Sequence, residues 1–271
     1  MSEPYISRES TVAEAHADQA QLERAVEAFV RGFSDSKSRT HPYVETRNEG
    51  VRAMHDAPRT GRTGYRKAEL VNLAGEPAQV DREARQLARS LGPAAKRWFL
   101  CAIRTEADLS AVEQEYAALG YRLMAREAFF TYELGGSTEV GVDSASRVRP
   151  VVGESDVREF FRWAKLRVTA RDLDAVAVGR IRRYVSLDGE EVVGSVASVA
   201  AGEATRWVSA LYVAESHRRQ GRGSELMRRM LLDDAATGNT LSVLLASKTG
   251  ARLYPQLGYR QIGTLLLYRP K

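Results

Sequence analysis

Two glycines one residue apart interrupt an apolar run in the second half of the chain. The segment 209–227 reads SALYVAESHRRQGRGSELM, with Gly221 and Gly223 between an expected strand and an expected helix. An anion bound at a strand-to-helix turn needs inward-pointing backbone N–H groups, the partial positive charge of a helix N-terminus and no Cβ in the way. Three arginines add positive charge at the same place: Arg218, Arg219 and Arg222. The segment therefore predicts a phosphate-binding turn, and the alternative is a glycine turn with a solvated basic face.

The elements that would position this turn form a regular series. Their order is strand, helix, three strands, helix, strand, helix and strand, which indicates a mixed α/β (α+β) fold. The expected elements are a strand at 147–152, a helix at 156–166 capped by Ser155, strands at 182–187 and 191–200 around an Asp188-Gly189 turn, a strand ending at Val213, a helix from Ser224, a strand at 241–246, a helix at 251–256 and a strand at 260–268.

The first half of the chain repeats the end of this series. Five of seven positions are identical between Tyr116–Arg122 and Tyr254–Arg260, and the elements around both copies follow the same order. We therefore predict two related domains, 1–134 and 147–271, each a mixed central sheet flanked by helices, joined by a small and polar linker at 135–146. The elements expected in the first domain are helices at 12–33, 77–90 and 109–116 and strands at 69–73, 97–103 and 121–134.

Composition limits the compartment and the partners. The single cysteine, Cys101, excludes an internal disulfide framework, no apolar run approaches the length of a membrane span, and the N-terminus lacks the pattern of a secretory signal, so we expect a cytoplasmic protein. The net charge of +5 suggests an anionic partner, but no nucleic-acid-binding motif occurs and nucleic acid is not favoured. The four histidines stand far apart, so we expect no metal site.

Two segments of the second half resemble the signature segments of the GNAT superfamily of acyl-CoA-dependent N-acetyltransferases. They are LYVAESHRRQGRGSELM at 211–227 and ARLYPQLGYRQIG at 251–263. In that family the pattern Arg/Gln-x-x-Gly-x-Gly/Ala binds the pyrophosphate of coenzyme A, and here Arg218, Gly221 and Gly223 occupy it. The resemblance covers about residues 147–271 and implies a GNAT fold with acetyl-CoA (coenzyme A) as the cofactor.

The resemblance also implies how the cofactor would be held. Backbone N–H groups of five residues would bind the pyrophosphate: Gln220, Gly221, Arg222, Gly223 and Ser224. Leu211, Tyr212 and Val213 would bond the pantetheine arm as if it were a further strand, at a splay between their strand and the next. Ser247 stands near a position where the family often contacts the cofactor, although a helix cap is an equal alternative.

Acetyl transfer to an amine needs a neutral nucleophile, a polarised thioester carbonyl and a proton for the departing thiolate. By resemblance Tyr254 is the general acid, and the alternative is a tyrosine packed on the sheet, as Tyr116 of the first half suggests. The general base is not identified. Where many relatives carry a glutamate this strand has Trp207 and Ser209, and Glu191 or Glu203 could act through water.

The first half has no corresponding glycine loop. Between its strand at 69–73 and its helix at 77–90 only Ala74-Gly75-Glu76 is present, so we expect a degenerate GNAT-like domain that shapes the acceptor site or an interface. The resemblance thus implies an enzyme, an N-acetyltransferase of the acyltransferase class, that transfers an acetyl group directly to a primary amine of an unidentified acceptor. A non-catalytic acyl-CoA sensor is the main alternative, and a homodimer stays open.

Overall fold

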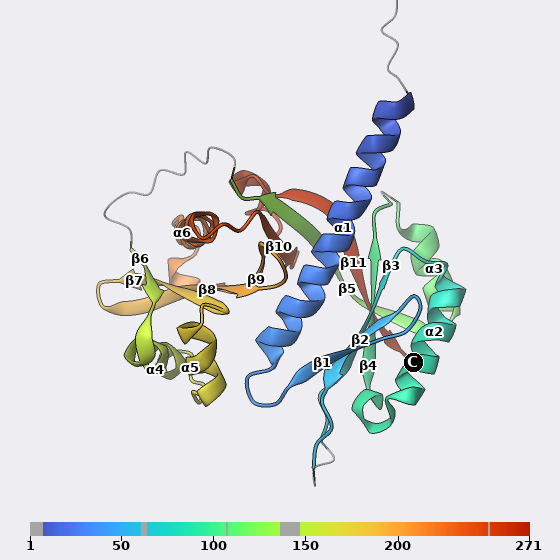
Figure 1. The fold of residues 1–271 in the computed structure, drawn as a ribbon, viewed down its shortest axis with the longest axis horizontal. Coiled ribbons are helices and arrows are strands. Elements are labelled where there is room, and N and C mark those ends of the chain that lie inside the picture. The colour runs from blue at the N-terminus through green and yellow to red at the C-terminus, as the bar shows by residue number, and fades with distance from the viewer. Residues whose placement is uncertain (1–7, 61–63, 107, 136–146, 249) are drawn as a thin grey trace, which may run out of the picture.

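The computed structural model describes residues 8–60, 64–106, 108–135, 147–248 and 250–271. Its centre is one mixed sheet with the strand order β1-β2-β3-β4-β11-β5-β10-β9-β8-β7-β6, and helices cover both faces (Figure 1). None of the described helices combines the length and the apolarity that crossing a membrane requires. The predicted α/β class is confirmed.

Helices and strands are intermixed along the chain. The α-helices are α1 (Arg8–Lys37), α2 (Pro77–Ser90), α3 (Ser110–Ala118), α4 (Gly153–Trp163), α5 (Ala170–Ala177) and α6 (Arg222–Ala236). Short 3-10 helices are η1 (Gly92–Ala95), η2 (Glu215–His217) and η3 (Pro255–Leu257). The strands are β1 (Tyr43–Arg47), β2 (Arg52–Asp56), β3 (Ala68–Leu73), β4 (Trp98–Arg104), β5 (Tyr121–Glu133), β6 (Val148–Val151), β7 (Ile181–Asp188), β8 (Glu191–Ala200), β9 (Thr205–Val213), β10 (Leu241–Ala246) and β11 (Arg260–Pro270).

The sheet is apolar on both faces because helices pack on each side. On β4, Cys101 and Ile103 join the cluster around α1, whereas Leu100 and Ala102 join the cluster around α2 and α3. The same alternation places α1, α4 and α5 on one face, here called face A, and α2, α3 and α6 on the other, face B. A site built at a strand of this sheet can therefore be approached from two differently covered sides.

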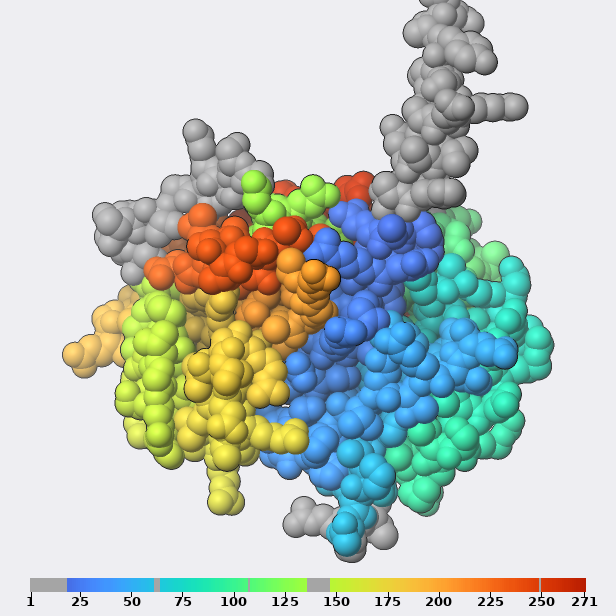
Figure 2. Space-filling view, in the orientation of Figure 1, coloured from blue at the N-terminus to red at the C-terminus, as the bar shows by residue number. Residues whose placement is uncertain are grey.

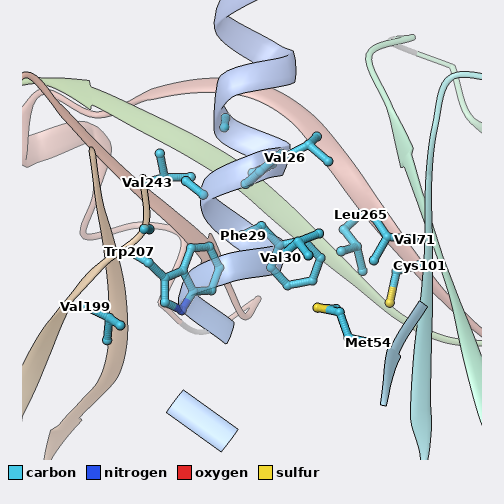
Figure 3. Packing of buried hydrophobic residues seen from close by; sticks show 14 of the residues in the cluster. Val26, Phe29, Val30, Met54, Val71, Cys101, Val199, Trp207, Val243 and Leu265 are labelled. Atoms are coloured by element: carbon cyan, nitrogen blue, oxygen red, sulfur yellow. The ribbon is translucent and has the colours of Figure 1, made fainter. Parts of the chain in front are cut away.

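Helix α1 packs on face A across the centre of the sheet. Its Val26, Phe29 and Val30 contact side chains from both halves of the chain, among them Trp207 and Cys101 (Figure 3). In the space-filling view α1, in dark blue, lies between the rest of the first half, in lighter blue and cyan, and the second half, in yellow and orange (Figure 2). One hydrophobic core therefore serves both halves.

The approach of α1 to β9 depends on a glycine. A Cβ on Gly32 would lie 2.2 Å from the Cβ of Trp207, so any larger residue would push the helix off the strand. The Phe29 and Trp207 rings lie 5.4 Å apart at this contact.

The closing strands of the two halves are exchanged. β11, at the C-terminus, pairs antiparallel with β4 and with β5, both from the first half, and β5 pairs with β10 from the second half. The repeated segments at Tyr116–Arg122 and Tyr254–Arg260 lead into these two strands. The two halves are thus interleaved in one sheet, and the division into domains at 134 and 147 remains a prediction about ancestry and folding.

Several predicted boundaries need correction. Helix α4 begins at Gly153, after Val152 as N-cap, so the prediction that Ser155 caps it is wrong; Val152 N–H donates to Asp156 Oδ2 at 3.0 Å. The helix predicted at 251–256 is a series of turns followed by η3. The β1–β2 hairpin and α5 were not predicted. The predicted linker lies outside the described residues from position 136 to 146.

Candidate active site

Strands β9 and β10 separate part of the way along their length. Their parallel pairing starts at Thr205 and Leu241 and ends at Trp207 and Val243, although β9 continues to Val213. β10 itself stays paired with β5 up to Ala246. Within the described residues, the edges of the two strands that face each other beyond Trp207 have no strand partner. The resemblance implied a splay between these strands, and Leu211, Tyr212 and Val213 lie along the part of β9 that β10 does not pair with.

A β-bulge lies on β9 at the same place. The pairing with β8 shifts by one residue between Ser195 and Ala197, and Ala210 has a positive φ of 55°. The extra residue changes the alternation, so that Ser209 and Tyr212 both line a cavity on face A. The bulge therefore places Ser209 and Tyr212 on the same face of the sheet, in the part of β9 that has separated from β10.

The predicted phosphate-binding turn joins β9 to α6 through η2. Gly221 is the N-cap of α6 with φ of 78°, and Arg219 has φ of 61°. No side chain caps the helix, and among the described residues no carbonyl or side-chain oxygen accepts a hydrogen bond from the amides of 220–224. A Cβ on Gly223 would come no closer than 3.5 Å to another atom, Leu253 Cδ2. Free amides at a helix N-terminus are suited to binding an anion.

The three arginines of the turn are placed differently. Arg218 and Arg219 are exposed, and Arg218 Nε donates to the carbonyl of Val213 at 3.0 Å. The guanidinium of Arg222 is buried and donates to Leu187 O at 2.7 Å and to Asp188 Oδ1 at 3.0 Å. Arg222 can therefore serve an anion through its backbone amide, while its side chain is committed to the β7–β8 turn.

His217 lies on the opposite side of the same carboxylate. Its Nε2 is 3.1 Å from Asp188 Oδ2, and hydrogen bonds from His217 and then Arg222 lower the pKa of Asp188. These contacts fasten the loop to the β7–β8 hairpin. They give His217 a structural role at the turn. No group of three or more His, Cys, Asp or Glu side chains among the described residues could hold a metal ion.

Tyr254 lies beside the N-terminus of α6. It is buried in the cluster that contains Leu226 and Met227 of α6, and its ring is 5.8 Å from that of Phe130. Burial raises the pKa of Tyr254 to about 12, and no described residue hydrogen-bonds its hydroxyl. Its neighbour in sequence, Leu253, is the side chain nearest to Gly223. Tyr254 is therefore adjacent to the predicted phosphate-binding turn.

Ser247 directly follows β10. Its carbonyl accepts from the amides of Gly250 and Ala251 at 2.9 and 3.0 Å, and its Oγ is 3.4 Å from Gly250 N. Ser247 thus stabilises the turn that leads to Tyr254 and does not cap a helix, since residues 251–254 form turns. Thr249 lies outside the described residues.

A cavity of about 620 Å³ lies on face A, on the other side of β9 from α6. It is bounded by α4, by β7, β8 and β9, and by two residues of the first half, Ser36 at the end of α1 and Arg39 just after it. Four aromatic side chains make up much of the wall: Phe160, Phe161, Trp163 and Tyr212. Its size is typical of a small-molecule site. The sequence predicted the helix that carries Phe160 and Phe161, but it did not predict that Ser36 and Arg39 of the first half would line the same cavity.

Glu191 and Glu203, the two glutamates considered as general bases, lie in different parts of the structure. Glu191 lines the cavity. Glu203 precedes β9, at the opposite end of a nine-residue strand from the bulge. The six residues from Glu203 to Ser209 span roughly 20 Å of extended chain, and Glu203 does not line the cavity. Trp207 is committed to the core against Phe29, and Ser209 lines the cavity.

In the first half the corresponding strands remain closed. β3 and β4 pair in parallel from Ala68–Trp98 through to Leu73–Ile103, and Arg104 Nη2 donates to Gly75 O at 2.5 Å across the following turn. No opening comparable to that between β9 and β10 occurs along these described strands.

The comparisons with known proteins agree with this geometry. Residues 180–261 match the family model described as an acetyltransferase (GNAT) domain. A GCN5-related N-acetyltransferase from Kribbella flavida is similar, with a TM-score of 0.64 and 14% identity over 91% of this chain and 95% of that chain. A putative GNAT acetyltransferase from Novosphingobium aromaticivorans has a TM-score of 0.51 and 16% identity over 90% and 97%. No curated protein sequence matches the chain.

A tandem GNAT protein from the clavulanic acid biosynthesis pathway is similar as well. Its TM-score is 0.52 at 14% identity, over 81% of this chain and 78% of that chain. Identities this low establish a shared fold and leave the substrate open. Residues 180–261 therefore match a GNAT acetyltransferase domain, and the chain shares its fold with GNAT proteins, a tandem one among them.

Proposed function

We propose that the chain is an acetyl-CoA-dependent N-acetyltransferase with one active site, in residues 147–271. The observation that carries this proposal is the coincidence of two features at one end of β9. The strand separates from β10 beyond Trp207, and the turn that follows it presents unpaired amides at the N-terminus of α6. An elongated thioester carrier with a diphosphate needs both an open strand edge and an anion site.

Coenzyme A would be held by the turn before α6 and by the open edge of β9. The amides of Gln220, Gly221, Arg222, Gly223 and Ser224 would bind the pyrophosphate, with Arg218 and Arg219 supplying charge. The open edge at Leu211, Tyr212 and Val213 would bond the pantetheine arm. Ser247 would act indirectly, through the turn before Tyr254. Bound acetyl-CoA would supply an activated acyl group.

Tyr254 is proposed as the general acid. As the C–N bond to the amine forms and the C–S bond breaks, Tyr254 would donate its proton to the departing sulfur, and the proton lost by the amine would leave to a base or to water. A phenol with a pKa of about 12 stays protonated at neutral pH and so holds the proton ready. Among the two glutamates considered, Glu191 is the one placed to accept a proton, because it lines the cavity.

The first half is proposed to be a degenerate GNAT-like domain. Its strands β3 and β4 stay paired where the second half opens, and the Ala74-Gly75-Glu76 turn carries an acidic residue in place of arginines. Ser36 and Arg39 line the cavity on face A, which supports a role in shaping the acceptor site.

The proposal is tested by calorimetry and by turnover. Titration with acetyl-CoA and with coenzyme A should give saturable heat with a dissociation constant in the micromolar range, and release of free coenzyme A should depend on an added primary amine. Absence of heat with both carriers would reject the cofactor assignment. Tight binding without release of coenzyme A across a broad amine panel would instead favour an acyl-CoA sensor.

A further inference from the structure

Arg183 presents an unpaired cation to the cavity on face A. It lies on β7, and its guanidinium carbon is 5.1 Å from the ring centre of Phe160 and 5.3 Å from that of Phe161. Among the described residues it forms no ion pair, and it lines the cavity together with both phenylalanines. Its neighbour Arg182 points to face B, where it pairs with Asp234.

The nearest acidic group is already committed to other donors. Both oxygens of Asp172 accept hydrogen bonds from Arg39, at 2.8 and 3.0 Å, and Oδ2 also accepts from the amide and hydroxyl of Thr169. Asp172 therefore neutralises Arg39 and leaves Arg183 without a counter-ion in contact. Burial lowers the pKa of Arg183 to about 10, so the group remains charged at neutral pH in a partly desolvated place. A buried cation without a partner is costly unless a ligand supplies the anion.

The charged and aromatic residues of the cavity wall indicate what kind of ligand would carry the anionic group. Arg39, Lys165 and Arg183 are the cations of the wall and Glu191 is its carboxylate, so with Arg39 paired the wall keeps an excess of positive charge. The aromatic side chains supply an apolar surface for the body of a ligand. A guanidinium held against aromatic rings presents a fixed fork that matches a carboxylate.

We propose that the acceptor is an amine with an apolar or aromatic body that also carries a carboxylate, as in an amino acid, and that Arg183 binds this carboxylate. The inference rests on the proposed function, since it names the substrate class of the same site. The amine would then lie toward the bulge on β9, where Ser209 and Tyr212 line the cavity next to the splay.

The test compares amines that differ only in the carboxylate. Phenylalanine with phenethylamine, tyrosine with tyramine and leucine with isoamylamine are assayed with acetyl-CoA in wild type, Arg183→Gln and Arg183→Lys. We expect wild type to prefer the carboxylated member of at least one pair. Arg183→Gln should lower kcat/KM for that member about 10- to 100-fold, which corresponds to about 1.4 to 2.7 kcal/mol, while its partner changes less than about twofold. Arg183→Lys should fall between the two because it keeps the charge and loses the fork.

Arg180→Gln is the matched control, since Arg180 is exposed immediately before the same strand and does not line the cavity. Unaltered acetyl-CoA affinity in Arg183→Gln shows that the variant is folded. A preference for the decarboxylated amines in wild type, or an equal loss for both members of a pair in Arg183→Gln, overturns the inference.

A separate binding measurement distinguishes this inference from the proposed function. Calorimetry with N-acetylphenylalanine and N-acetylphenethylamine measures binding in the cavity without turnover. We expect Arg183→Gln to weaken binding of N-acetylphenylalanine and to leave that of N-acetylphenethylamine unchanged. If acetyl-CoA does not bind, the proposed function fails while this measurement still decides the role of Arg183. If acetyl-CoA binds and neither acetylated ligand shows dependence on Arg183, the carboxylate assignment alone fails.

Discussion

Tyr254 and Tyr116 occupy equivalent positions in the two halves but have different surroundings. The Tyr116 hydroxyl is 3.4 Å from Arg104 Nη2, and its ring packs within 4.6 Å of that of Tyr268. Tyr254 is also buried, yet its hydroxyl has no described partner and lies on the half with the open strand edge. The packed-tyrosine alternative therefore describes Tyr116, and a proton-donating role is proposed for Tyr254.

We expect Tyr254→Phe to lower kcat by about 100-fold, a typical contribution of a general acid, with less than about twofold change in the KM for acetyl-CoA. Because the pKa of Tyr254 is raised to about 12, the group stays protonated across the accessible range, and wild-type kcat should show no loss from this tyrosine below about pH 11. Steady-state kinetics across pH measures both. Tyr132→Phe, in a tyrosine that packs against Tyr259 in the same cluster, is the control. Undiminished turnover in Tyr254→Phe would reject it as the acid.

Asp172 is a second residue whose environment makes a measurable prediction. Burial on its own raises the pKa of Asp172, but hydrogen bonds from Arg39 and Thr169 outweigh it and hold the pKa below its usual range. A depressed pKa contributes stability that is fully present above about pH 4, the unfolded value, and is lost as the pH falls through the folded value. Asp172 also completes the capping box of α5 with Thr169.

We therefore expect Asp172→Asn to cost about 3 kcal/mol at pH 7, because it leaves Arg39 without its buried partner. The difference between wild type and variant should shrink at pH 3. Urea unfolding at the two pH values measures this. Asp174→Asn, on the exposed side of the same helix, should have a small effect at both pH values. An Asp172→Asn penalty that is unchanged at pH 3 would contradict the assigned pKa direction.

At the scale of elements, the two glycines at the N-terminus of α6, Gly221 and Gly223, have different roles. Gly221 is needed for its backbone conformation, with φ of 78°. Gly223 lies within the first turn of the helix, where an added Cβ has only ordinary contacts. We therefore expect the need for glycine at position 223 to come from the bound cofactor.

We expect Gly221→Ala to destabilise the protein by about 1 kcal/mol, because alanine resists the left-handed conformation. Gly223→Ala should leave stability unchanged or raise it by about 0.5 kcal/mol, because alanine favours a helix. Calorimetry should show weaker acetyl-CoA binding in both variants. Thermal denaturation should show a lower Tm for Gly221→Ala and an unchanged or higher Tm for Gly223→Ala. If Gly223→Ala binds acetyl-CoA as wild type does, this glycine is not a cofactor contact.

At the scale of the whole molecule, the exchange of β5 and β11 ties the two halves together. Residues 147–271 alone would leave β11 without both of its neighbours, since these are β4 and β5. The core around α1 would also lose its helix. An isolated second half should therefore be deprived of much of its buried surface.

We expect the fragment 147–271 to show no cooperative unfolding transition, because its edges and core depend on the first half. A chain cut between 135 and 147 and co-expressed as two pieces should co-purify and bind acetyl-CoA. Circular dichroism and calorimetry on the three preparations measure this. Cooperative folding of 147–271 alone would show that the predicted domain is autonomous.

Some missed features had a local signal in the sequence. Thr169 and Asp172 have the spacing of a capping box, and this pattern would have located α5. The β1–β2 hairpin was hidden because its strands are short and rich in charged residues, several of which pair across it, such as Arg52 with Glu45. By contrast, α1 carries a clear signal, because Leu22, Val26, Phe29 and Val30 recur at helical spacing and all four are buried.

The sequence alone determined the features that depend on a few neighbouring residues. The Asp188-Gly189 turn, Pro77 in the first turn of α2 and the glycine turn before α6 follow from backbone preferences and periodicity within a short window. Only the tertiary structure decided which strands close the sheet, because β5 and β11 follow similar segments and alternation does not specify a partner. It also decided that Arg39 and Arg183, far apart in sequence, line one cavity and that the Arg222 guanidinium turns away from the predicted anion site, since long-range packing sets these directions.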